Sequence, residues 1–149
     1  MRRTELYARF APLSAFCLVI ATFGFDVLAR VLVRGRSFAD AVSQSVEQIL
    51  EGPFLMFLLV VPFVALTGLT VEVGKTANAK VAGVYFGVFG TLLGYMYFSG
   101  YWGAQSALED GAWTAASLSV PMIAFWSVAV IVLAGLAVAW IERKYRRET

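Results

Sequence analysis

The chain has 149 residues, of which 60% are apolar, 15% aromatic and 15% charged, with a net charge of +2 and a mean hydropathy of +0.75. Soluble domains average about 45–50% apolar and about 25% charged residues. The composition therefore excludes an ordinary water-soluble globule, a disordered chain and a basic nucleic-acid-binding protein. The length predicts a single transmembrane domain over residues 1–149, with lipid as its main solvent.

The residue types that the sequence lacks exclude several kinds of catalytic, redox and metal-binding sites. The sequence has no histidine and a single cysteine, Cys17. Histidine metal sites, histidine-activated nucleophiles and dithiol redox exchange therefore lack the residues that they require. No glycine-rich phosphate loop and no pair of acidic residues within an apolar stretch is present either. We expect no enzymatic activity, no cofactor and no metal.

Four apolar stretches of 19 to 24 residues are long enough to cross about 30 Å of hydrocarbon as helices. Together they contain two of the 22 charged residues of the chain. This pattern predicts an all-α integral membrane protein that contacts the lipid bilayer, built as a four-helix up-down bundle. The predicted spans cover residues 10–33, 53–71, 81–103 and 119–141.

The distribution of lysine and arginine predicts the orientation, because positive residues are retained on the cytoplasmic side. Nine lie in the termini and the second connection, against two in the first connection and none in the third. We therefore expect both termini in the cytoplasm, in a membrane of the bacterial inner-membrane type. The nine are Arg2, Arg3, Arg9, Lys75, Lys80, Arg143, Lys144, Arg146 and Arg147, and the two are Arg34 and Arg36.

The connection between the first two spans has the pattern of a helix over residues 37–51. Ser37 can cap its start, and Gly52 followed by Pro53 gives a stop signal. Its polar surface includes Gln44 and Gln48. An apolar stripe is formed by Phe38, Val42, Val46, Ile49 and Leu50. We expect an amphipathic helix on the outer face that lies on lipid or on the bundle mouth. The stripe is a candidate partner surface, unless the helix only carries the chain between spans.

Two charged residues lie within the first predicted span. Asp26 and Arg30 are four residues apart, so a helix places them on one face as an intramembrane ion pair. Each would cost about 2.5–3.5 kcal/mol if it were isolated at the centre of a span. Asp26 can be a structural partner of Arg30, a protonatable site in a transporter, or a contact to a charged partner. The self-contained pair favours the structural interpretation.

The third span carries a seam of glycines, Gly83, Gly87, Gly90 and Gly94, which a helix aligns on one face. Glycine is costly inside a helix, and such small-residue faces allow helices to approach closely in lipid. The seam therefore predicts a helix-packing contact. Packing within the same chain is favoured, and packing against a second molecule is the alternative.

Two functional hypotheses follow. The first is a protein that binds a membrane or periplasmic partner as an accessory subunit. Four spans with both ends inside are similar to some immunity proteins against pore-forming toxins, and that likeness implies a related role. The second is a small oligomeric transporter or channel that uses Asp26, since small four-helix exporters resemble this chain in size and in one acidic residue of the first span. The second and fourth spans offer few polar residues to line a path, so partner binding is favoured.

Overall fold

The computed structural model describes residues 2–147, with side chains described for residues 2–145. The side chains of Arg146 and Arg147, counted in the orientation argument, lie outside this part. Over the described residues the chain is helical and has no strand. The elements are α1 (Arg3–Val19), the π-helical turn η1 (Ile20–Gly24), α2 (Phe25–Leu32), α3 (Phe38–Glu51), α4 (Pro53–Thr76), α5 (Ala79–Glu109) and α6 (Trp113–Arg147). Four long apolar candidate spans packed as a bundle confirm the predicted fold class.

The helices of the bundle extend beyond the predicted apolar stretches. The third span, expected over residues 81–103, lies within the 31-residue helix α5. Its start is fixed by Asn78, whose side chain accepts hydrogen bonds from the backbone N–H of Lys80 at 2.9 Å and of Val81 at 3.0 Å. At about 1.5 Å per residue, 31 residues reach beyond the hydrocarbon. Hydropathy marks the part of a helix in lipid, whereas capping marks its ends.

The first span differs from the single regular helix that the sequence predicts. The turn η1 interrupts it, and Thr22 within that turn donates its hydroxyl to the carbonyl of Leu18 at 2.8 Å. A π-helical turn inserts an extra residue and so changes which face of the following helix points at its neighbours. Accordingly, α1 packs mainly against α4, whereas α2 packs against α5 and α3.

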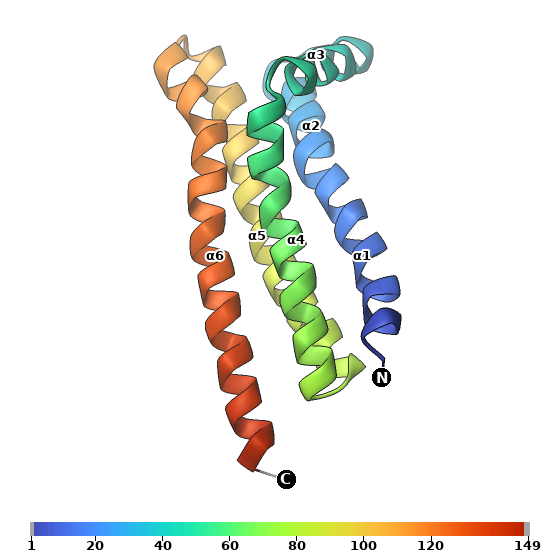
Figure 1. Cartoon of the computed structure of the whole chain (residues 1–149). Helices are drawn as coiled ribbons and strands as arrows, with labels where there is room; N and C mark the ends of the chain where they lie inside the picture. Colours follow the sequence, from blue (N-terminus) through green and yellow to red (C-terminus); the bar gives the residue numbers. More distant parts are fainter. Residues whose placement is uncertain (1, 148–149) are drawn as a thin grey trace.

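Figure 1 shows α3 lying across one end of the bundle that the long helices form. The start of α1 and the end of α6 lie at the opposite end (Figure 1). We call these the α3 end and the terminal end. Helices α4, α5 and α6 all contact one another, and α1 lies against this group through α4. At the terminal end, Arg3 of α1 pairs with Glu72 of α4 at 3.5 Å.

The glycine seam of α5 lies largely open. An added methyl group at Gly83, Gly87 or Gly94 would meet no heavy atom within 4 Å, and one at Gly90 would reach Leu66 of α4 only at 4.0 Å. Among the described residues the seam therefore has few neighbours. Its role in helix packing, within the chain or against a second molecule, stays a prediction.

A neighbouring face of α5 is buried instead, and it carries the bulky side chains. Tyr85 donates its hydroxyl to the carbonyl of Ala134 in α6 at 2.9 Å, and Tyr97 donates to the carbonyl of Leu59 in α4. Both tyrosines are buried. Burial of large aromatic side chains with satisfied hydroxyls removes more surface than a glycine face can. This explains why α5 turns Tyr85 and Tyr97, and not the glycines of the seam, towards the bundle.

Two other glycines mark the close approaches between helices. At Gly74 of α4, an added methyl group would lie 2.8 Å from a methyl carbon of Leu6 in α1. At Gly100 of α5, it would overlap the branched side chain of Ile123 in α6. These isolated glycines lie outside any Gly-x-x-x-Gly pair, so their sequence context did not indicate their role.

We predict opposite effects for two glycine substitutions in α5. Gly100→Ala should lower the free energy of unfolding by about 1–3 kcal/mol, because the added methyl group overpacks the α5–α6 contact. Gly87→Ala should leave it unchanged or raise it by up to about 1 kcal/mol, since alanine favours the helix and the site is open. Denaturation of the purified monomer in mixed micelles measures both. Equal losses would contradict the assigned packing.

Candidate functional site

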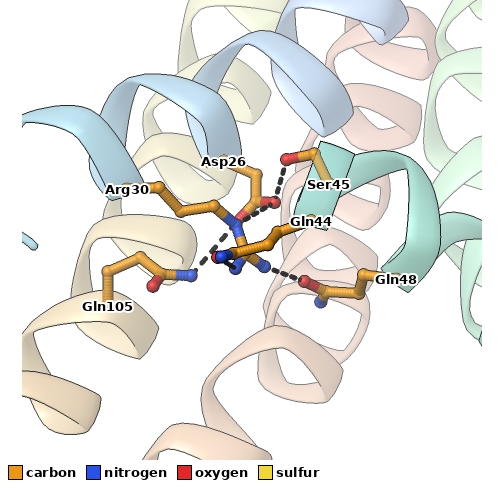
Figure 2. Close-up of polar contacts among 6 residues, drawn as sticks. All are labelled: Asp26, Arg30, Gln44, Ser45, Gln48 and Gln105. Carbon is orange, nitrogen blue, oxygen red and sulfur yellow. Dashed lines mark hydrogen bonds and ion pairs between the residues drawn. The ribbon is translucent and has the colours of Figure 1, made fainter. Parts of the chain in front are cut away.

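A polar cluster lies at the α3 end of the bundle and joins three helices (Figure 2). We call it the Asp26 cluster. It is formed by Asp26 and Arg30 of α2, Gln44, Ser45 and Gln48 of α3, and Gln105 of α5. The structure therefore brings together the two charged residues singled out in the sequence with four polar residues that were not.

Asp26 is the centre of the cluster and is only 3% exposed. Its Oδ2 accepts hydrogen bonds from Nε of Arg30 at 2.9 Å and from the hydroxyl of Ser45. Its Oδ1 accepts from the amide nitrogen of Gln105 at 3.2 Å. Each carboxylate oxygen therefore has a donor, and the donors come from three different helices.

Arg30, 8% exposed, links the carboxylate to α3. Its Nη1 donates to the side-chain oxygen of Gln44 at 3.1 Å, and its Nη2 donates to that of Gln48. Removing a single buried partner from such a pair leaves an uncompensated charge, which is far costlier than the pair itself. The cluster therefore makes the position of α3 depend on the ion pair.

The structure turns part of the polar surface of α3 towards the bundle, whereas the acidic residues of this helix stay exposed. Gln44, Ser45 and Gln48 face Arg30 and Asp26, so the side of the helix that the sequence assigned to the polar surface is partly an internal contact. The N-cap at Ser37 is formed as predicted: its hydroxyl oxygen accepts from the backbone N–H of Asp40 at 3.2 Å. The helix lies on the bundle mouth through polar contacts.

The apolar stripe of α3 is left largely uncovered. Phe38 is 71% exposed, Val46 42% and Leu50 73%, whereas Val42 and Ile49 are half-buried. Of the two arrangements predicted for this helix, contact with the bundle mouth is observed for the polar side. The stripe remains available for lipid or for a partner.

Two buried polar atoms near the cluster lack a hydrogen-bond partner among the described residues. They are the hydroxyl oxygen of Tyr101 and the side-chain oxygen of Gln105. The residues are one turn apart on α5 and are 1% and 3% exposed. Buried polar groups are almost always satisfied, so such atoms indicate a place where another molecule or a water contributes the missing bond.

A cavity of about 210 Å³ opens beside these residues, between α5 and the start of α6. The polar lining residues are Arg30, Gln48, Gln105 and Ser117, and Ala104, Leu108 and Val120 are among the apolar ones. The cluster is therefore buried in the bundle on one side and borders a cavity on the other.

The buried serine and threonine hydroxyls along the spans do not extend the polar cluster. Ser14 and Thr67 both donate to the carbonyl of Phe63, Thr70 donates to that of Leu66, and Ser127 donates to that of Ala124. Hydroxyl groups committed to backbone carbonyls satisfy themselves within the helices. Within residues 2–147, no group of three His, Cys, Asp or Glu residues is arranged to hold a metal ion.

Comparisons with known proteins give no relative from which a role could be transferred. No protein-family model and no curated protein matches the sequence, and no solved structure matches the fold. We therefore infer the function from the chain's own residues.

We predict that Arg30→Met destabilises the protein by about 3–5 kcal/mol, because it leaves the buried Asp26 carboxylate without its countercharge. The double variant Asp26→Asn/Arg30→Met should recover part of this loss, since both charges are removed. Denaturation in mixed micelles measures the free energy, and hydrogen exchange should show earlier opening of α3 in the single variant.

Lys75→Met is the matched control for this experiment. Lys75 pairs with Glu72 at 2.8 Å, but both side chains are more than a third exposed. Screening by water limits such a pair to about 1 kcal/mol or less. An Arg30 variant as stable as the Lys75 variant would contradict the structural role of the Asp26 cluster.

Proposed function

We propose that this integral membrane protein works by binding another membrane or exported protein, as an accessory subunit or in a role like that of toxin-immunity proteins. The observation that supports this most directly is the anchoring of α3 by its polar side, which leaves the stripe of Phe38, Val46 and Leu50 uncovered. A helix fixed by buried bonds presents its apolar side chains in a constant arrangement, which lowers the entropic cost of binding.

The alternative, a small transporter or channel using Asp26, has less support. Coupled transport requires an ionisable group that changes partners during the cycle, yet both oxygens of Asp26 are engaged by Arg30, Ser45 and Gln105. A conducting path also needs polar groups that face a lumen, whereas the buried serine and threonine hydroxyls of the spans bond to backbone carbonyls. We therefore propose partner binding as the primary function and no enzymatic activity.

We also propose that the α3 end is the outer end and that both termini are cytoplasmic, on the basis of the lysine and arginine distribution. Single cysteines at Ser43 and Asp110 should then react with an impermeant maleimide added outside intact cells, and one at Lys80 should not. All three positions are exposed, and Cys17→Ser provides the cysteine-free background. Outside labelling of the Lys80 position alone would reverse the orientation.

Photocrosslinking in native membranes tests the partner surface. A benzophenone amino acid at Phe38 or Leu50 should give one discrete protein adduct, because both side chains project from the exposed stripe. The same amino acid at Phe125, a 65% exposed residue of α6, is the lipid-facing control and should give no adduct of that mass. Electrophoresis followed by mass spectrometry identifies the product.

The alternatives give different products in this experiment. Adducts with lipid alone at the stripe, or the same protein adducts from Phe125, would contradict the proposed surface. A product of twice the 16.3 kDa chain mass would replace the heterologous partner with a homo-oligomer, the alternative to which the open glycine seam of α5 also points.

A further inference from the structure

The cavity beside the Asp26 cluster combines polar groups at one side with an apolar wall. Its volume of about 210 Å³ exceeds the roughly 150 Å³ of an apolar protein cavity that holds benzene. Trp113 and Val120 of α6 and Leu108 of α5 are among its apolar lining residues. Space for a ring or a short chain therefore lies next to Arg30 and Gln105.

The orientation of the Gln105 amide leaves an acceptor unused. A carboxylate can only accept hydrogen bonds, so the amide nitrogen, and not its oxygen, must face Asp26. The oxygen is consequently left without a partner among the described residues, although Gln105 is 3% exposed and lines the cavity. A molecule in the cavity could satisfy this oxygen only by donating a hydrogen bond.

Arg30 offers unused donors at the same cavity. A guanidinium has five N–H groups. The contacts to Asp26, Gln44 and Gln48 use one on each nitrogen, which leaves two without an assigned acceptor in the described part of the chain. The positive charge of Arg30 is already balanced by Asp26, and no other charged residue in the described part of the chain lines this cavity.

We propose that this cavity is a binding site for a small uncharged molecule that carries a primary amide or a hydroxyl group on an apolar ring or chain. Such a group donates to the oxygen of Gln105 and accepts from the guanidinium of Arg30, and the apolar part lies against Trp113, Leu108 and Val120. A net charge is disfavoured because the ion pair already balances itself. The site does not depend on the proposed partner, although it shares Arg30 and Gln48 with the contacts that hold α3.

Benzamide is the probe that tests the proposal. In a protein with Trp102, Trp126 and Trp140 replaced by phenylalanine, Trp113 is the sole tryptophan and lines the cavity, so selective excitation of tryptophan reports on this site. Titration in micelles should give a saturable change in its fluorescence. N,N-dimethylbenzamide, which lacks the N–H donors for Gln105, should bind at least tenfold more weakly.

Ala116→Leu fills the cavity from α6 without altering the Asp26 cluster, and it should weaken benzamide binding at least tenfold. Ala115→Leu is the control, since Ala115 is exposed and lines a different groove between α5 and α6. A photoreactive benzamide on the otherwise unaltered protein needs no substitution: it should label residues 104–120, and excess benzamide should prevent this.

The proposal is overturned if the fluorescence changes linearly with benzamide, as partitioning into the micelle would produce. Equal responses to both amides, or labelling outside residues 104–120 that excess benzamide does not reduce, would overturn it as well. If benzamide changes the Trp113 fluorescence at no concentration, the ligand site is excluded. Ordered water would then be the hydrogen-bond partner of the buried polar atoms of Tyr101 and Gln105.

Discussion

The need to satisfy one buried carboxylate determines how the α3 end of the bundle is built. Asp26 is almost inaccessible, and an unpaired charge there would oppose both insertion and folding. Its donors are Arg30 from the same helix, Ser45 from α3 and Gln105 from α5. Because they come from separate elements, satisfying the charge requires the bundle and the crossing helix to assemble together.

The same requirement explains the unusual placement of α3. An amphipathic helix on a soluble core buries its apolar stripe, since that is where free energy is gained. Next to a buried ion pair in lipid, leaving a polar group without a partner costs more free energy than leaving an apolar stripe uncovered. Helix α3 therefore turns Gln44 and Gln48 inwards and leaves Phe38 and Leu50 uncovered. The apolar stripe of this amphipathic helix is thereby left for lipid or a partner, which is the basis of the proposed binding role.

The two faces of α5 show that a small-residue pattern in the sequence need not mark the face that packs inside the chain. The glycine pattern is a good sign that helices can approach closely, but it does not specify which helix approaches. Within the chain, the close approaches occur at Gly74 and Gly100, where Leu6 and Ile123 fill the space. The seam at Gly87 lies open, because the tyrosine-bearing face of α5 forms the internal contacts.

The sequence by itself determined the number and placement of the long helices, the capped helix predicted over residues 37–51 and the pairing of Asp26 with Arg30. Hydropathy, capping residues and i,i+4 spacing are local along the chain, so they can be read without the fold. Only the tertiary structure decided that Gln105, 79 positions from Asp26, donates to the second oxygen of the carboxylate. It also decided that Gln44, Ser45 and Gln48 of α3 face inwards and that a cavity borders Arg30. These features depend on the π-helical turn at Ile20–Gly24 and on the rotation of each helix about its axis, which distant contacts set.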